Sequence, residues 1–268
     1  MSAAASRPRN EGALKGRVAI VTGAGKGIGL AAAHALASEG ASVAICDSDD
    51  KAGRAAVKGL AGSTAPVVFV KGDVSSSADA KRMVASAVKK LGQVSILVNS
   101  AGIQRYGSVV EAPEEQWDEV LGVNLKGIFL MSKYAVPAIM AAGGGSIVNI
   151  ASVQALAAQR GVAAYAASKG GVVALTRAMA VDHAPDIRVN AILPGSVDTP
   201  MLRDAAALFA DDPDKAIERW GHMHPMGRVA APSEVGQAVA FLAGPHSSFI
   251  TGASLLVDGG LLSTIGGT

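Results

Sequence analysis

Several features are scarce in this chain of 268 residues, and each scarcity excludes a class of protein. The single cysteine, Cys46, leaves no partner for an intrachain disulfide, and its apolar surroundings predict a small buried side chain. The net charge of +2 lacks the basic footprint of a nucleic-acid-binding protein. No apolar run reaches the roughly 18 residues that a membrane-spanning helix needs. We therefore expect neither nucleic acid nor a membrane as a partner.

Aromatic residues are also scarce, at 4%, although half of the residues are hydrophobic. The core must therefore be built from Ala, Val, Leu and Ile, and the 32 glycines favour helices packed closely on a parallel sheet. Residues 1–12 are small and polar and lack the apolar middle of a signal peptide. We expect them to form a disordered tail and the protein to be cytoplasmic.

Short apolar runs alternate with longer alanine-rich segments along the rest of the chain. The runs lie at residues 18–21, 43–46, 67–70, 96–98, 147–150, 189–193 and 255–257. Helices are predicted at residues 28–39, 49–60, 78–91, 113–141, 162–183 and 233–242. This alternation predicts an α/β fold: one doubly wound Rossmann domain over residues 13–268, with a seven-stranded parallel sheet and helices on both faces. Residues 198–232 interrupt the pattern with four prolines and no strand, which is typical of a lid or binding segment.

The stretch after the first predicted strand is rich in glycine and leads directly into a predicted helix. Glycines allow a tight turn and a close approach to a pyrophosphate, which the free N–H groups of a helix N-terminus bind. A plain strand-to-helix turn is the alternative, but the position between strand and helix favours a dinucleotide site. The candidate cofactor-binding residues here are Gly23, Lys26, Gly27, Ile28 and Gly29.

The second predicted strand ends at Asp47, about 20 residues further on. A carboxylate at this point accepts hydrogen bonds from an adenosine ribose and repels a 2′-phosphate, which favours NAD over NADP. Lys26 is a counter-signal, because a cation beside the loop could hold a 2′-phosphate. A cap for the following helix is the alternative role of Asp47.

Tyr165 and Lys169 are four residues apart within a predicted helix, so their side chains share one face. A tyrosine pKa is ordinarily about 10, and an adjacent ammonium favours the phenolate, which predicts a group able to exchange a proton with an alcohol or carbonyl. Ser152 follows a predicted strand and could hydrogen-bond the same oxygen. The alternative is an ordinary helix with a core tyrosine and a solvated lysine.

Polar or special residues also follow other predicted strands, at the edge where open α/β sheets bind ligands. Over residues 14–260 the chain resembles the short-chain dehydrogenase/reductase family. The motifs that carry the resemblance are residues 22–29, Asp73-Val74, residues 99–102, Asn124, Ser152, Tyr165 with Lys169, Pro194-Gly195 with Thr199, and Thr251-Gly252 with residues 258–260. The one visible departure is Ser100, where the family more often has a second asparagine.

The resemblance implies a role for each matching residue. Tyr165 would be the acid/base, Lys169 would lower its pKa and hold the nicotinamide ribose, Ser152 would orient the substrate oxygen, and Asn124 would anchor a water of a proton relay. Asp73 and Val74 would contact the adenine, Asn99 would sit under the cofactor, and Thr199 would face the carboxamide. Ala101, Gly102, Pro194, Gly195 and Val197 complete the implied cofactor site. Taken alone, Asn124 could be a buried helical asparagine and Asp73 a helix cap.

The substrate is predicted from the residues expected at the mouth of the site. Gln104, Gln154, Arg160 and Met201 are the candidates, with Arg105, Tyr106 and Gln159 beside them. These glutamines and arginines favour a sugar, a polyol or a sugar acid, and solvated or subunit-bridging side chains are the alternative. His222 and His224 have no carboxylate or cysteine cluster around them, so we expect loop or surface histidines and no metal.

Three rival functions remain open. The first is a 3-oxoacyl-thioester reductase, which would prefer NADPH. The second is an NAD-binding regulator without turnover, and the third is another Rossmann enzyme such as a methyltransferase. The resemblance also implies a homotetramer, in which the helices at 113–141 and 162–183 pair between subunits and the last strand forms a second interface.

Overall fold

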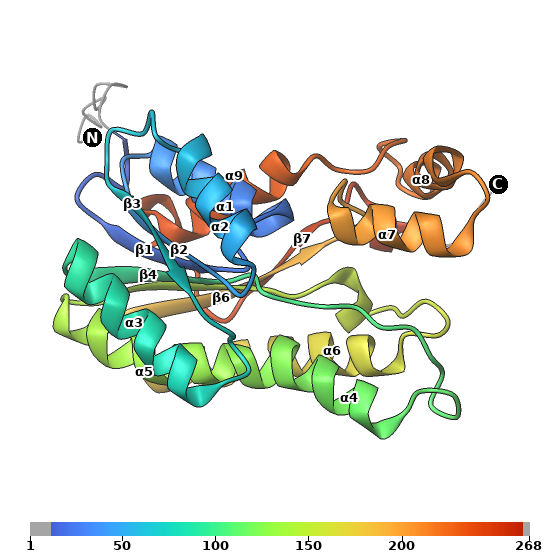
Figure 1. The fold of residues 1–268 in the computed structure, drawn as a ribbon, viewed down its shortest axis with the longest axis horizontal. Helices are drawn as coiled ribbons and strands as arrows, with labels where there is room; N and C mark the ends of the chain where they lie inside the picture. Colours follow the sequence, from blue (N-terminus) through green and yellow to red (C-terminus); the bar gives the residue numbers. More distant parts are fainter. Residues whose placement is uncertain (1–11, 265–268) are drawn as a thin grey trace, which may run out of the picture.

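The computed structural model describes residues 12–264, so the predicted N-terminal tail lies outside the described residues except for Gly12. Seven parallel strands form one sheet in the order β3-β2-β1-β4-β5-β6-β7, which confirms the predicted doubly wound fold (Figure 1). The strands are β1 Val18–Thr22, β2 Ser42–Asp47, β3 Val67–Lys71, β4 Val94–Asn99, β5 Gly145–Ile150, β6 Ile187–Pro194 and β7 Ser254–Val257.

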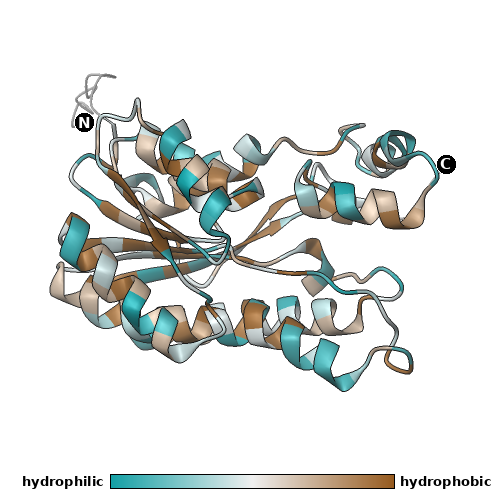
Figure 2. Ribbon diagram, viewed as in Figure 1, coloured by the Kyte–Doolittle hydropathy of each residue, from teal (hydrophilic) through white to brown (hydrophobic). Residues whose placement is uncertain are grey.

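The central strands are mainly hydrophobic because both faces of the sheet are covered (Figure 2). Every residue of β1 and of β4 is buried. Cys46 in β2 is buried as well, as predicted, and burial raises the pKa of its thiol to about 12. The polar helix faces point to solvent, so the sheet and the inner helix faces make the core.

Helices cover the two faces of the sheet as separate layers (Figure 1). One layer holds α1 Gly27–Ser38, α2 Asp50–Gly59 and α9 Pro232–Ala243. The other holds α3 Ser77–Leu91, α4 Glu114–Leu121, α5 Gly127–Ala141 and α6 Ala163–His183. Each layer has its own apolar cluster: Leu36 and Val239 belong to the first, and Met83 and Met131 to the second.

The predicted helix over residues 113–141 is not a single α-helix. Between α4 and α5 the chain makes a π-helical turn, η1 Gly122–Lys126, and remains helical throughout. A π-turn inserts an extra residue without changing the apolar pattern much, so periodicity alone could not reveal it. Its consequence is local, because it carries the buried Asn124.

The strand order places a crevice at one edge of the sheet. β1 and β4 are neighbours, and their connections lead to opposite layers, which is the arrangement that leaves an opening beyond the carboxyl ends of the strands. The segment 198–232 lies beyond the same edge as α7 Pro200–Phe209 and α8 Pro213–His222 (Figure 1). It contains two helices and, among the described residues, no strand beyond one isolated bridge from Val197 to Ala230, as predicted.

No helix within residues 12–264 has both the length and the apolar character to cross a membrane.

Candidate active site

The glycine-rich loop closes tightly on the start of the β4 loop. Gly23 has a φ of +62°, and a Cβ on it would lie 2.7 Å from the Ala101 Cα, so only glycine fits there. Thr22 ends β1, and its hydroxyl accepts hydrogen bonds from the backbone N–H groups of Ser100 (3.1 Å) and Ala101 (3.2 Å). Thr22 begins the motif at residues 22–29 but was not among the candidate cofactor-binding residues, although its position at the strand end was visible in the sequence. The structure thus joins the loops after β1 and β4 along the crevice.

Asp47 fixes the same loop from the other side. Its Oδ2 accepts a hydrogen bond from the Gly25 N–H at 2.8 Å, and its Oδ1 accepts one from Asp49 N–H at 2.9 Å. The cap of α2 is instead Asp49, which accepts from the Ala52 N–H at 3.0 Å. The alternative role of Asp47 as that helix cap is therefore wrong. Each Asp47 oxygen keeps a lone pair for a further donor.

Asp73 and Val74 follow β3, where the adenine was expected. Asp73 Oδ1 accepts hydrogen bonds from the backbone N–H and the hydroxyl of Ser75, at 2.9 and 2.8 Å. The cap of α3 is Ser76, so Asp73 forms a local turn and does not cap that helix. Val74 is buried against Gly127 of α5.

Asn99 ends β4 in a buried polar chain beneath the crevice. Its Nδ2 donates to Asn149 Oδ1 at 2.8 Å, and Asn149 Nδ2 donates to Thr176 Oγ1 at 2.9 Å. The Asn99 Oδ1 is buried and has no protein partner. The chain joins β4, β5 and α6, so it holds the floor of the site rigid.

Asn124 lies in the π-turn with no exposed surface. Its Oδ1 accepts from the Ile103 N–H at 2.8 Å, while its Nδ2 donates to Ile103 O at 2.9 Å and to Ser168 Oγ at 3.1 Å. Both amide hydrogens are therefore used. A Cβ on Gly102 would lie 3.4 Å from Asn124 Oδ1 and 3.6 Å from Lys169 Nζ, so these three residues share one corner of the crevice.

Tyr165 and Lys169 occupy the first turns of α6, as predicted. Lys169 is 4% exposed, its Nζ donates to Ile150 O at 2.9 Å, and it lies 5.5 Å from the centre of the Tyr165 ring. Burial lowers the pKa of Lys169 to about 8. The helical spacing therefore places both groups beside the end of β5.

The expected lowering of the Tyr165 pKa by Lys169 is not what the protein shows. Tyr165 is 8% exposed, and burial raises its pKa to about 12, while a hydrogen bond with the Ser152 side chain opposes the rise. The physical reason is that desolvation of the phenolate outweighs the effect of its neighbours. Ser152 also accepts a hydrogen bond from the Gln154 N–H at 3.1 Å, which places its hydroxyl at the end of β5.

The loop after β6 brings four predicted cofactor residues to the crevice. Pro194 ends the strand, and Gly195 N–H donates to Val257 O at 3.1 Å. Val197 is buried, and Thr199 caps α7 by accepting from the Leu202 N–H at 3.4 Å. A Cβ on Gly27 would lie 3.4 Å from Thr199 Cγ2, so this loop faces the glycine-rich loop across the crevice.

The predicted substrate residues divide into two groups. Gln104, Gln154 and Met201 are half-buried, and the Gln154 Oε1 is buried with no protein partner. Arg160 is exposed. Arg105 forms a bidentate ion pair with Glu119 at 3.0 and 2.7 Å, so its charge is neutralised on the α4 side.

Tyr106, one of the residues expected at the mouth, makes a contact that the sequence did not reveal. It packs in one apolar cluster with Tyr165, and its ring meets Phe209 at the end of α7 edge-on, with centroids 4.6 Å apart and planes at 84°. Its neighbour Gly107 donates from its N–H to Gly161 O at 2.7 Å. The aromatic contact therefore joins α7 to the wall beside Tyr165.

The two histidines of the segment 198–232 differ in burial. His222 is exposed, but His224 is buried, because its ring bridges two backbone groups. Within residues 12–264, no group of three or more His, Cys, Asp or Glu side chains could hold a metal ion.

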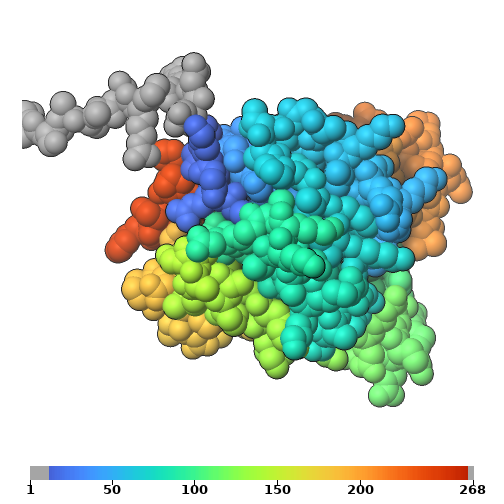
Figure 3. Space-filling model, turned by 60° about the vertical axis from the view of Figure 1, so that its left-hand side comes forward, coloured from blue at the N-terminus to red at the C-terminus, as the bar shows by residue number. Residues whose placement is uncertain are grey.

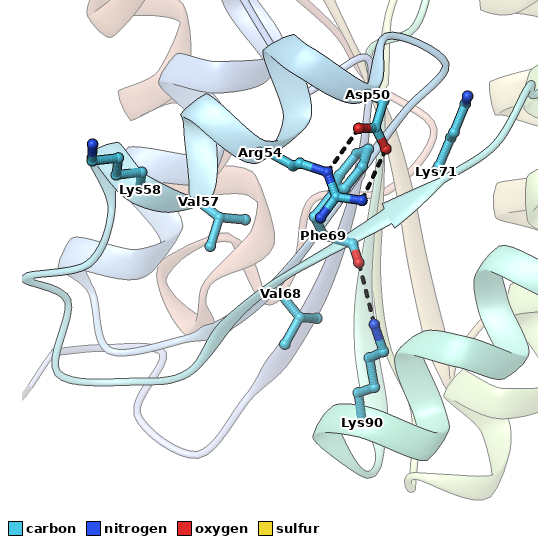
Figure 4. A pocket seen from close by; sticks show the side chains of 8 residues that line it. All are labelled: Asp50, Arg54, Val57, Lys58, Val68, Phe69, Lys71 and Lys90. Atoms are coloured by element: carbon cyan, nitrogen blue, oxygen red, sulfur yellow. Dashed lines mark hydrogen bonds and ion pairs between the residues drawn. The ribbon is translucent and has the colours of Figure 1, made fainter.

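A hollow of about 620 Å³ lies away from the crevice, at the open edge of β3 (Figure 4). None of the candidate site residues lines it. Lys90 Nζ donates to Phe69 O at 3.3 Å, and Arg82 donates to Lys71 O at 2.8 Å, so cations cover the outward carbonyls of this edge strand. Such coverage protects an edge strand from pairing with another chain. Figure 3 shows this face, with α2 in light blue and α3 in teal.

Comparison with known proteins gives a consistent result. The profile of the family described as "Enoyl-(Acyl carrier protein) reductase" matches residues 23–262. The chain is 40% identical over 253 residues to the 3-oxoacyl-[acyl-carrier-protein] reductase FabG of Thermotoga maritima, covering 93% of this chain and 99% of the relative. It is 39% identical over 247 residues to the L-fucose dehydrogenase of Oryctolagus cuniculus, covering 91% of this chain and 84% of the relative.

A solved structure agrees with these relatives. The ligand-free aldohexose dehydrogenase of Thermoplasma acidophilum superimposes with a TM-score of 0.89 at 38% identity, covering 97% of this chain and 99% of the other. All three names describe oxidation or reduction of alcohol or carbonyl groups. Together with the parallel sheet and the crevice at its edge, these likenesses show that the chain belongs to the short-chain dehydrogenase/reductase family and is an oxidoreductase acting on alcohol or carbonyl groups.

Proposed function

We propose that the protein uses NAD to interconvert a secondary hydroxyl and a carbonyl on a sugar, a polyol or a sugar acid, with Tyr165 as the acid/base. The observation that carries the proposal is the meeting of Ser152, Tyr165 and Lys169 at the end of β5, on the crevice that the glycine-rich loop and Asp47 also line.

The proton chemistry follows from the state of the buried groups. With a pKa of about 12, Tyr165 holds its proton at neutral pH and can donate it to a carbonyl oxygen. In the reverse direction the Tyr165 phenolate takes the hydroxyl proton and becomes neutral, and the Ser152 hydrogen bond stabilises that phenolate before the transfer. Because the pKa of Lys169 is about 8, its side chain is mostly an ammonium at pH 7 and stabilises the same negative charge.

Asn124 would anchor the relay water as a hydrogen-bond acceptor. Its two amide hydrogens are already donated to Ile103 O and Ser168 Oγ, so its side chain cannot donate to a relay water. A relay water at this corner would be held by an oxygen acceptor, such as the second lone pair of Asn124 Oδ1. We therefore assign Asn124 to holding the corner and to accepting a hydrogen bond from that water.

The crevice fits a nicotinamide dinucleotide. The Gly23 and Gly27 backbone has no side chain to block a pyrophosphate, and the start of α1 supplies free N–H groups. Asp47 would hold the adenosine ribose, Asp73 and Val74 the adenine, and Lys169 and Thr199 the nicotinamide end. When bound, the dinucleotide accepts or supplies the hydride.

The preference for NAD over NADP rests on Asp47. Its carboxylate is held in place by two backbone N–H groups, so it cannot easily swing away from a 2′-phosphate. Repulsion between the two negative groups disfavours NADP. Lys26 is exposed beside the loop and is a cation that could oppose this preference.

The polar atoms at the mouth support a hydroxylated substrate. Gln154 Oε1 is buried without a partner, which makes it a ready acceptor for a substrate hydroxyl. Gln104 and Met201 are half-buried beside the crevice and would complete the wall. The ion pair of Arg105 with Glu119 weakens the case for an anionic substrate, so we rank neutral sugars and polyols above sugar acids. Two of the similar proteins carry names that refer to sugars.

A 3-oxoacyl-thioester reductase that uses NADPH is the second candidate. The 40% identity to a protein named as such a reductase favours it, and Asp47 opposes it. A panel of aldoses, sugar acids, polyols, secondary alcohols and hydroxyacyl thioesters, each with NAD and NADP, decides between the two when reduced cofactor is followed by absorbance. Turnover with one sugar-like class and NAD is the expected result. Turnover only with thioesters and NADPH would replace our proposal, and NADH binding without any turnover would favour a regulator.

We also propose a homotetramer and a cytoplasmic location. The tetramer follows the family, and exposed apolar side chains support it: Phe129 on α5, Val181 on α6 and Phe249 before β7. Light scattering of the pure protein tests it, since a monomeric mass would contradict the proposal.

A further inference from the structure

His224 is a buried titratable residue that the proposed chemistry does not use. It follows α8 and is 3% exposed, whereas its neighbours Met223 and Met226 are exposed. Its Nε2 accepts a hydrogen bond from the Ser196 backbone N–H at 3.1 Å, and its Nδ1 lies 2.9 Å from Trp220 O. The ring therefore connects the end of α8 to the loop after β6.

The hydrogen bonds define the tautomer of the ring. Because the Ser196 N–H can only donate, Nε2 must be an unprotonated acceptor. Nδ1 then carries the hydrogen and donates it to Trp220 O, a carbonyl in the last turn of α8. Both ring nitrogens are thus committed to backbone groups.

The fit around the ring is close. A Cβ on Gly195 would lie 2.8 Å from His224 Nε2, so the backbone at Gly195 passes directly beside the imidazole. Ser196 is held on its other side as well, because its carbonyl accepts from the Ala230 N–H at 2.9 Å. The short loop between Gly195 and Val197 is therefore clamped by the segment that leaves α8.

We propose that His224 is a positioning residue for the nicotinamide end of the cofactor. It fixes Ser196, and with it Gly195 and Thr199 on either side, to the base of the α7–α8 segment. This inference rests on the proposed cofactor site, in which Thr199 holds the nicotinamide end and Gly195 and Val197 lie in the same loop. A merely space-filling residue would not suffice, because an apolar side chain would leave the Ser196 N–H without an acceptor.

Three variants separate positioning from packing. His224→Leu fills the space and removes the acceptor, whereas His224→Gln places an amide oxygen near the position of Nε2. His222→Leu, at an exposed histidine two residues away, is the matched control. If His224→Leu does not fold, His224→Asn replaces it, since its shorter amide cannot reach Ser196.

Two measurements test the inference. The first is hydrogen exchange of the peptide containing Ser196 in the protein without cofactor, which we expect to be about tenfold faster in His224→Leu than in the wild type. The second is NADH affinity by fluorescence, which we expect to fall about tenfold in His224→Leu and to be largely restored in His224→Gln. The KM for NAD should change more than kcat at saturating NAD.

Either measurement can overturn the inference. An unchanged rate of hydrogen exchange at Ser196 in His224→Leu would show that His224 does not hold this loop. Equal losses of NADH affinity in the Leu and Gln variants would show that His224 acts only by packing. A wild type that binds no NADH would instead overturn the proposed function and the cofactor part of this inference, while the exchange data would still decide whether His224 holds Ser196.

Discussion

The two sides of the crevice are built in different ways. On the cofactor side, backbone groups at the strand ends are tied to one another: Gly25 to Asp47, and Ala101 to Thr22. On the substrate side, α7 and α8 reach over the crevice from a base at the loop after β6, and the outer end of α7 meets the wall through Phe209 and Tyr106.

This difference indicates where variation is tolerated. The cofactor side uses hydrogen bonds that the parallel sheet itself positions, so its geometry follows from the fold. The substrate side depends on exposed or half-buried side chains, which can change without disturbing the core. We therefore expect variants on the first side to change chemistry, stability or cofactor choice, and variants on the second to change substrate affinity. Variants of both kinds test this division.

Tyr165→Phe should lower turnover by about 10²- to 10⁴-fold and leave NADH affinity nearly unchanged, because it removes only the proton that the hydroxyl exchanges. Steady-state kinetics and NADH fluorescence measure the two quantities. Tyr134→Phe is the matched control, since the Tyr134 hydroxyl bonds Ser77 on the outer side of the helical layer. Retained turnover in Tyr165→Phe would remove Tyr165 from the acid/base role.

Lys169→Met should change how stability depends on pH. Burial lowers the pKa of Lys169 from 10.5 to about 8, so between these values the unfolded chain binds more protons than the folded protein. The destabilising effect of the buried ammonium is complete below about pH 8 and disappears as the pH rises to 10.5. The wild type should therefore gain up to about 3 kcal/mol relative to the variant across this window.

Denaturant unfolding at several pH values measures this gain. Lys133→Met, at an exposed lysine of α5, is the control and should show no comparable change. If the difference in unfolding free energy between the wild type and Lys169→Met stays constant with pH, burial does not lower the pKa of this lysine.

Asp47→Ala should lower the ratio of kcat/KM for NAD to that for NADP by roughly tenfold or more, because it removes the charge that repels a 2′-phosphate. Asp49→Ala is the control: it removes the cap of α2, at a cost of about 1 kcal/mol in stability, and should leave the ratio unchanged. Equal ratios in the wild type and Asp47→Ala would assign the preference to another group.

Phe209→Ala should raise the substrate KM about two- to tenfold with little change in NADH affinity, because an edge-to-face aromatic pair contributes about 0.5–1.5 kcal/mol. Leu208→Ala is the matched control, since Leu208 and Phe209 are 63% and 59% exposed on the same helix. If both variants act alike, the contact with Tyr106 does not hold α7 over the substrate.

Much of the fold could be predicted because the chain repeats one simple signal. Buried parallel strands are apolar on both faces, so the seven runs were visible as short β-branched segments. The π-turn at Gly122–Lys126 was not visible, because the surrounding residues keep a helical pattern. The positions of the candidate site residues could also be predicted, because these residues follow strand ends or lie at helical spacing.

Contacts between distant segments explain what the sequence alone missed. The clamp of His224 on Ser196 spans 28 residues, and the Tyr106–Phe209 contact joins the loop after β4 to the end of α7. Neither leaves a periodic signal. The ion pair of Arg105 with Glu119 likewise lowers the net positive charge expected at the mouth. The sequence spacing of these two residues does not predict that their side chains meet.

The strand–helix alternation, the glycine-rich turn and the pairing of Tyr165 with Lys169 follow from the amino-acid order alone, because they depend on local spacing and local geometry. The charge states of the site follow from the folded structure. Desolvation raises the Tyr165 pKa to about 12 and lowers that of Lys169 to about 8, and desolvation depends on what the whole fold places around each group.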